Sequence, residues 1–187
     1  GIRELLRAWN ALPHPLRAGW TLLCVGEGPE ASRIEAAAAL AEPGEIQRFP
    51  AIAPDAMPAL YAACDLLVFP TLGDPWGLVV NEAMACGLPI LCSRRAGACD
   101  ELVSEGPGGN GFCCDPLEPA ELARALREAL CAPDLHERGL RARERIRGFG
   151  PERMAEDMRR AIRSTLSEDT LQSGPPAERL AHSEPSF

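Results

Sequence analysis

The 187-residue sequence lacks the features that mark several common classes of protein. It has no apolar run near the ~18 residues needed to cross a bilayer, and its first residues lack the basic-then-apolar order of a signal peptide. Basic residues are in deficit, and the formal net charge of −8 argues against nucleic-acid binding, which normally needs a basic face. We therefore expect a cytoplasmic chain without a nucleic-acid partner. Any peripheral membrane association would be decided by residues outside it.

The sequence also lacks the spacing of a metal site. Its eight cysteines form no CxxC pair, no histidine lies at ligand spacing, and no DxD-like motif is present. We expect reduced structural thiols, no metal and no cofactor. Four of the cysteines fall in apolar runs, where a free thiol packs as a small hydrophobic group: Cys24, Cys92, Cys113 and Cys114.

Short apolar runs alternate with segments of helical periodicity along the chain. This alternation predicts an α/β domain with a doubly wound, mostly parallel, Rossmann-like sheet and helices on both faces. The predicted strands are 22–25, 46–49, 66–69, 89–92 and 112–114. The predicted helices are 2–9, 29–40, 57–61, 76–86, 99–103 and three more that carry Leu122 to Leu130, Leu135 to Ile146 and Met154 to Leu166.

Three local expectations follow from residue type. Pro29 suits the first position of a helix, and the unbroken apolar run 66–69 is typical of a strand buried on both faces. Met154 and Met158 have the spacing of core residues in the last helix. Beyond it the texture becomes polar and rich in Pro and Gly, so we expect one partial domain over 1–166 and a disordered tail over 167–187.

The segment from Thr71 to Ile90 is the most informative part of the chain. It joins a predicted strand to a helix whose first turn offers the unpaired N–H groups of Gly77, Leu78 and Val79 as donors for phosphate. In a doubly wound sheet this turn lies at the ligand-binding edge. The segment is therefore expected to bind an anionic ligand.

Two acids in the same segment, Asp74 and Glu82, could accept hydrogen bonds from sugar or ribose hydroxyls. Spacing alone leaves an alternative open for each residue. An aspartate before a helix is often only a cap, and a helical glutamate is often only a solvated side chain.

The same segment closely resembles the E-x7-E signature of retaining GT-B glycosyltransferases of the glycosyltransferase group 1 family. Asp74 stands at the first acid position and Glu82 at the second. Further matching runs, Val25 to Glu30, Leu60 to Leu66 and Asn110 to Phe112, extend the resemblance over nearly all of the expected domain. The chain is similar to the C-terminal, donor-binding domain of these enzymes.

The resemblance implies a nucleoside-diphosphate sugar as donor and transfer to an acceptor hydroxyl with retention of configuration. Asp74 and Glu82 would be the catalytic acids, with Glu82 holding the ribose and Asp74 near the reacting carbon of the sugar. Gly26, Gly77, Leu78 and Val79 would complete the donor site. The acceptor, whether glycan, lipid or small molecule, is not specified by these residues.

The chain departs from the family pattern in three ways. Asp74 replaces a glutamate and is one methylene shorter, and Pro50 and Ala51 replace a small residue followed by glycine near the base pocket. The family's first strand, with its phosphate-binding Arg and Lys, would precede Gly1, as would an N-terminal Rossmann-like domain. That strand is central in the family's sheet, so we expect unpaired strand edges, a marginally stable or associating chain, and no activity from these residues alone.

Two other functions remain possible from the sequence. The first is a non-catalytic nucleotide-sugar-binding or interaction module derived from such an enzyme, since Asp74 is altered and the family's cations are absent. The second is an unrelated doubly wound domain such as a phosphoacceptor receiver. That alternative is weak, because the chain lacks clustered acids at strand ends together with a lysine.

Overall fold

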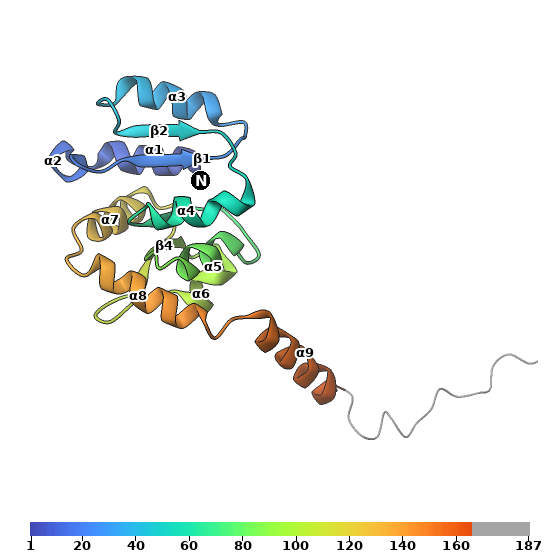
Figure 1. Cartoon of the computed structure of the whole chain (residues 1–187). Helices are drawn as coiled ribbons and strands as arrows, with labels where there is room; N and C mark the ends of the chain where they lie inside the picture. The colour runs from blue at the N-terminus through green and yellow to red at the C-terminus, as the bar shows by residue number, and fades with distance from the viewer. Residues whose placement is uncertain (166–187) are drawn as a thin grey trace, which may run out of the picture. The chain divides into compact units, whose positions relative to one another are not determined.

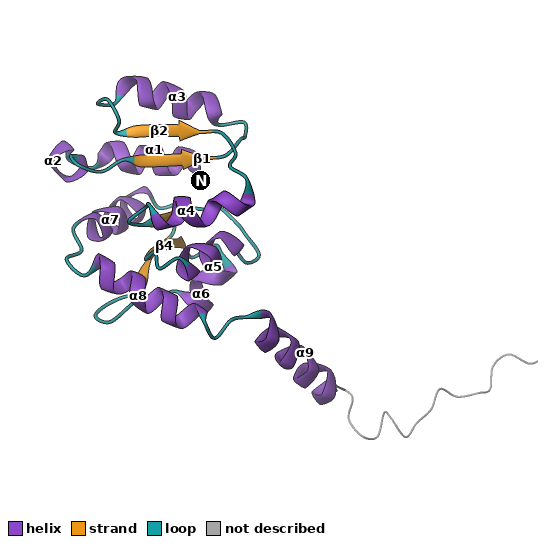
Figure 2. Cartoon of the chain, in the orientation of Figure 1, coloured by secondary structure: helices purple, strands orange, loops and turns teal. Residues whose placement is uncertain are grey.

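The computed structural model describes residues 1–165 and divides the chain into two bodies, Gly1–Arg147 and a second that starts at Gly148. The expected tail, 167–187, lies outside the described residues. The first body alternates helices and strands (Figures 1 and 2). Its elements are α1 (Ile2–Ala11), α2 (His14–Arg17), β1 (Leu22–Val25), α3 (Ala31–Leu40), β2 (Ile46–Phe49), the short 3₁₀ turn η1 (Pro54–Ala56), α4 (Met57–Ala62), β3 (Leu67–Phe69), α5 (Leu78–Ala85), β4 (Ile90–Ser93), α6 (Gly97–Leu102), β5 (Gly111–Cys114), α7 (Pro119–Leu130) and α8 (Leu135–Ile146).

All the strand pairings of the first body are parallel, as predicted. β1 pairs with β2 from Leu22 opposite Ile46, and β3, β4 and β5 form a second group in that order. Each strand is followed by a helix before the next strand, which is the connection that parallel strands require. The α/β fold class with parallel sheets flanked by helices is therefore confirmed.

Alternate residues of the buried strands face two separate cores, as the pleat of a strand requires. In β4, Leu91 packs against α1 and α7, whereas Ile90 and Cys92 pack against α5 and α6. β5 does the same, with Phe112 on the first side and Cys113 on the second. Helices thus cover both faces of this sheet, which is the doubly wound arrangement.

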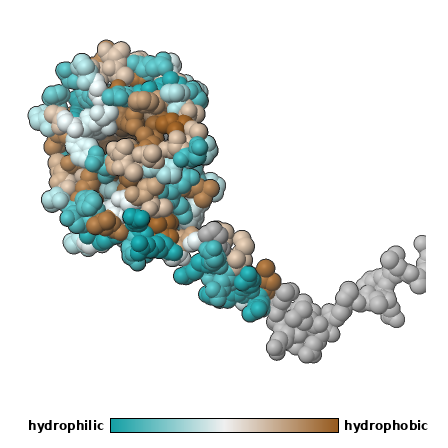
Figure 3. Space-filling model, viewed as in Figure 1, coloured by the Kyte–Doolittle hydropathy of each residue, from teal (hydrophilic) through white to brown (hydrophobic). Residues whose placement is uncertain are grey.

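The sheet is interrupted between β1 and β3. Among the described residues each of these strands has one paired edge and one edge without a strand partner. A cavity of about 870 Å3 lies between them and is lined along its length by β1 and β3. In Figure 3 apolar residues gather on this face, at the level where Figure 1 places the N-terminus. The expected unpaired edges are present.

Two of the local expectations were wrong in this body. β3 is half-buried rather than buried on both faces, because one of its edges and the adjoining side chains border the cavity. Pro29 does not begin a helix; it lies in a turn in which the Gly28 carbonyl accepts from the Ala31 N–H at 3.2 Å, and α3 begins at Ala31. Gly26, in the preceding bend, has a φ of 131°, a conformation that favours glycine.

The second body contributes α9 (Pro151–Thr165). Its apolar residues recur every four positions, but Met154 and Met158 are 62% and 59% exposed, so the expectation that they fill the core was wrong. The helical periodicity of this segment was predicted correctly, but the burial of its apolar side chains was not. In the part of the chain that the structure describes, no helix combines the length and the apolar character that a membrane span requires.

Candidate functional site

The start of α5 has the geometry expected of an anion-binding turn. Gly77 is the N-cap residue and has φ of 95°, a left-handed conformation that glycine adopts without strain. A Cβ at this position would lie 2.7 Å from the Cε1 atom of Phe69, so glycine is also required for packing against the end of β3. Within the described residues, the N–H groups of Gly77, Leu78 and Val79 have no acceptor. They remain available to a ligand.

The loop that carries Asp74 is fixed by its backbone. The Asp74 N–H donates to the Arg95 carbonyl at 3.1 Å, and its carbonyl accepts from the Gly97 N–H at 3.2 Å, forming a single parallel bridge. The Ala98 N–H donates to the Trp76 carbonyl at 2.9 Å. The segment that follows β4 therefore determines where Asp74 lies, although it is some twenty residues distant in sequence.

The Asp74 carboxylate has one local partner. Its Oδ1 atom accepts the Trp76 N–H at 2.9 Å, which closes a turn before α5. The cap of α5 is Gly77 and not Asp74. The alternative role of Asp74, as a capping residue, thus accounts for one carboxylate oxygen, which closes a turn. The other oxygen has no hydrogen-bond partner within the described residues.

Glu82 lies one turn into α5 and is exposed. Its Oε2 atom accepts a hydrogen bond of 2.9 Å from the hydroxyl of Tyr61, which is 6% exposed and belongs to α4. Burial and the hydrogen bond to Glu82 raise the pKa of Tyr61, so the phenol stays protonated at neutral pH. Glu82 is therefore an accessible carboxylate that a buried donor holds from one side.

The predicted residues are brought together only in part. Gly26 and Val79 line the same cavity, at the end where β1 and β3 terminate. Leu78 and Glu82 do not line it; Leu78 is 69% exposed at the start of α5. In doubly wound sheets ligands bind outside the carboxyl ends of the strands, and this end of the cavity is that edge.

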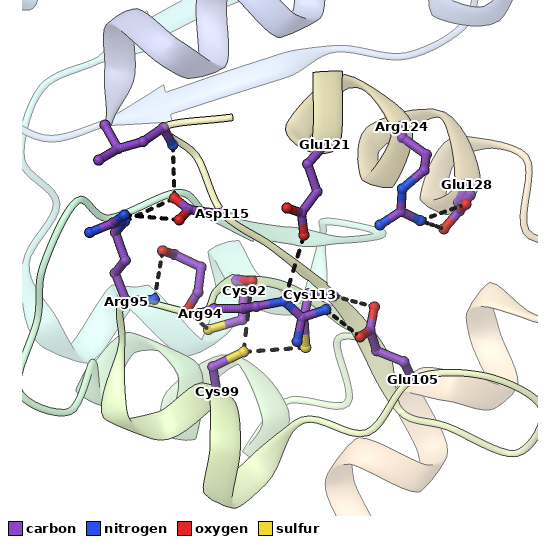
Figure 4. A network of polar contacts seen from close by, with 12 residues as sticks. Cys92, Arg94, Arg95, Cys99, Glu105, Cys113, Asp115, Glu121, Arg124 and Glu128 are labelled. Carbon is purple, nitrogen blue, oxygen red and sulfur yellow. Dashed lines mark hydrogen bonds and ion pairs between the residues drawn. The ribbon is translucent and has the colours of Figure 1, made fainter. Parts of the chain in front are cut away.

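A set of ion pairs borders the same edge after β4 and β5 (Figure 4). Arg95 donates to both oxygens of Asp115, at 2.8 and 2.9 Å, and Arg94 lies 2.7 Å from Glu105. The pairing with Arg95 lowers the pKa of Asp115 below its ordinary value. Both arginines are about half exposed and already paired, as expected for surface charges.

Beneath these ion pairs lie buried thiols. Cys99 and Cys113 have sulfurs 3.2 Å apart, and burial raises the pKa of Cys114 to about 12. No group of residues that could hold a metal ion occurs within residues 1–165. The thiols therefore pack in the core between β4, β5 and α6.

Sequence reasoning missed two features of the site. Tyr61 was placed in its helix but not linked to Glu82, although it is the only tyrosine of the chain and lies in an alanine-rich helix. The bridge between Asp74 and Ala96 had no local signal, because it joins two loops through backbone atoms.

Comparison with known proteins supplies a family. The family model described as glycosyl transferases group 1 matches residues 1–146. A D-inositol 3-phosphate glycosyltransferase of Salinispora tropica is 34% identical over 166 residues, which covers 82% of this chain and 33% of that relative. A 2-deoxystreptamine glucosyltransferase of Streptomyces kanamyceticus is 33% identical over 117 residues, covering 61% of this chain and 29% of that protein. The chain spans about a third of the length of these relatives.

Solved structures give the same result. Anabaena Alr3699/HepE in complex with UDP-glucose aligns with a TM-score of 0.63 and 27% identity, over 89% of this chain and 44% of that one. WaaG, a glycosyltransferase involved in lipopolysaccharide biosynthesis, aligns with a TM-score of 0.63 and 26% identity, over 77% of this chain and 38% of that one.

Proposed function

Because this chain belongs to the glycosyltransferase group 1 family, we propose that it binds the nucleotide-sugar donor of a GT-B glycosyltransferase. The observation that carries the proposal is the start of α5, where three unpaired N–H groups lie beside the two acids of the family's signature. These donors would hold the diphosphate and stabilise the negative charge that develops when it leaves. The sugar would pass to an acceptor hydroxyl with retention of configuration.

Each acid then has a separate role. Glu82, exposed and held by Tyr61, would accept hydrogen bonds from the ribose hydroxyls. Asp74 would contact the donor sugar near the reacting carbon, using the oxygen that Trp76 leaves free. Gly26 and Val79 would line the phosphate crevice at the end of the cavity.

The donor requires charge neutralisation that the described residues supply only in part. The chain's 19 basic residues are all arginine. Arg94 and Arg95, after β4, are already paired with acids, and so is Arg48, which lines the cavity. We propose that helix N–H groups provide part of the stabilisation, that the Arg and Lys of the family pattern provide the rest, and that the acceptor site comes from a second Rossmann-like domain. The structure of a relative with bound UDP-glucose supports a uridine nucleotide as the first ligand to test.

One observation favours a second function. The Asp74 carboxylate already accepts the Trp76 N–H, and it is shorter than the glutamate of the family pattern. A chain in which this residue only shapes the loop would be a nucleotide-sugar-binding module without catalysis. Such a module would keep the ribose and diphosphate contacts and lose the contact to the sugar.

The proposal can be tested by thermal unfolding of the purified chain with UDP, GDP or ADP and with their sugars. A ligand at about 100 times its Kd should stabilise the folded chain by about 2.7 kcal/mol. We expect one base to raise the melting temperature, the shift to disappear in Glu82→Ala, and Glu137→Ala, an exposed glutamate in the first turn of α8, to retain it. A cooperative transition that no nucleotide shifts would contradict the donor site. A shift of equal size with and without the sugar would favour the non-catalytic module.

A further inference from the structure

The hydrogen bond between Tyr61 and Glu82 joins two helices at the proposed ribose site. The hydroxyl of Tyr61, on α4, donates to Glu82 Oε2, on α5, at 2.9 Å. Tyr61 is 6% exposed, whereas Glu82 is exposed. A buried, rigid donor therefore holds a carboxylate that faces solvent.

The contact leaves half of the carboxylate for a ligand. Within the described residues, Glu82 Oε1 receives no hydrogen bond, and Oε2 receives only that of Tyr61. A carboxylate offers about four acceptor positions, so one hydrogen bond from Tyr61 leaves enough to accept two hydroxyl groups. A ribose presents two neighbouring hydroxyls, and a carboxylate fixed in orientation can accept from both.

A free glutamate on a helix surface would be a poorer partner. Its side chain rotates about three bonds, and binding would have to restrict that freedom. Tyr61 restricts it beforehand, since its ring is fixed by packing in the core that also contains Val80 and Met84 of α5. The rigid element is thus the helix pair, and the hydroxyl transfers that rigidity to Glu82.

We propose that Tyr61 is a positioning residue for ribose recognition, which holds Glu82 in the orientation that accepts the two ribose hydroxyls. This inference rests on the proposed donor site. The phenol acts as a donor throughout the neutral range, because burial and Glu82 raise its pKa. Tyr61 also lines the cavity that Gly26 and Val79 border, and the proposed effect on ribose passes through Glu82.

The test compares nucleoside diphosphates that contain ribose with the same compounds containing 2′-deoxyribose. Affinities are measured for the purified 187-residue chain, Tyr61→Phe, Glu82→Gln and the double variant. Tyr61→Phe keeps the ring that packs in the core and removes only the hydroxyl. We expect it to bind the ribonucleotide about tenfold more weakly, equivalent to ~1.4 kcal/mol, and to lose less affinity for the deoxynucleotide, which keeps only the 3′ hydroxyl. The double variant should be no weaker than Glu82→Gln alone, because the two residues act as one unit.

Trp9→Phe is the matched control for the loss of a buried aromatic donor. The indole of Trp9 donates to Glu45 Oε1 at 2.9 Å, in a different part of the fold. This variant should lower the melting temperature and keep the preference for ribose. Equal losses for both sugars in Tyr61→Phe, or an unchanged preference, would overturn the positioning role and leave the donor site standing. If the parent chain binds no nucleoside diphosphate, or Glu82→Gln keeps the full preference, the donor site fails and this inference fails with it.

Discussion

Replacing Gly97 with alanine would separate two loops that together position Asp74. A Cβ on Gly97 would lie 2.3 Å from the carbonyl oxygen of Pro75 and 3.6 Å from the Cα of Trp76. The loops would have to move apart by about 0.7 Å to restore even the closest contact found in proteins, 3.0 Å. Both neighbours are backbone atoms, so no side chain can rotate away to relieve the contact.

The displacement strains the hydrogen bonds that tie the loops together. These are the bonds of the Asp74 N–H to the Arg95 carbonyl, of Gly97 to Asp74 and of Ala98 to Trp76. Overpacking costs about 1–3 kcal/mol, and each weakened hydrogen bond adds up to ~1 kcal/mol. We expect Gly97→Ala to lower the free energy of unfolding by about 2–3 kcal/mol in a urea titration.

The ligand assay separates the two acids. Because Asp74 moves and Glu82 does not, the affinity of Gly97→Ala for a nucleotide sugar should fall about tenfold. Its affinity for the nucleoside diphosphate should change little.

Gly73→Ala is the matched control, since it lies in the same loop region and a Cβ there meets nothing within 4 Å. It should change stability by less than about 0.5 kcal/mol. The reasoning is refuted if Gly97→Ala behaves like Gly73→Ala in both assays.

Three further predictions concern the rest of the fold. The hydrogen bonds of Arg3 and then Arg33 hold the pKa of Glu30 at about 2, below its ordinary value of 4.5. The ion pairs of Glu30 should therefore stabilise the folded state fully above pH ~4.5 and progressively less as the pH falls towards 2. When stability is measured by thermal unfolding, Arg3→Gln should lose less stability than the parent as the pH falls from about 4.5 to about 2. In a thiol titration of the folded chain the exposed Cys131 should react first and the buried Cys114 only on unfolding, and equal rates would contradict the described packing. The unpaired edges of β1 and β3 should make the purified chain either associate or have a low melting temperature. A monomer in light scattering that unfolds in a sharp, reversible calorimetric transition at an ordinary temperature would argue against this.

Most of the helices and strands could be predicted because their signals are local. The runs 22–25 and 46–49 coincide with β1 and β2, and Gly87, with φ of 86°, follows the end of α5 as expected of a helix-stopping glycine. The half-buried state of β3 could not be inferred from its apolar run, because burial depends on what lies beside a strand. In α9, Met154 and Met158 likewise have helical spacing but are 62% and 59% exposed, because spacing does not specify what a side chain packs against.

The candidate site was predictable as a segment and not as an arrangement. Asp74, Gly77 and Glu82 lie within nine residues of one another, so the sequence alone could place all three around the start of one helix. The partners that fix them come from elsewhere, Tyr61 from α4 and Ala96 from the loop after β4. Those contacts depend on how helices and loops pack, which no single sequence pattern encodes.

The most direct test of the account is a crystal structure of the chain with the nucleoside diphosphate that stabilises it most. We predict that the ribose hydroxyls lie within hydrogen-bond distance of the Glu82 carboxylate and that Tyr61 still donates to Oε2. We also predict that phosphate oxygens face the N–H groups of Gly77, Leu78 and Val79. A nucleotide bound elsewhere, or one whose ribose makes no contact with Glu82, would contradict it.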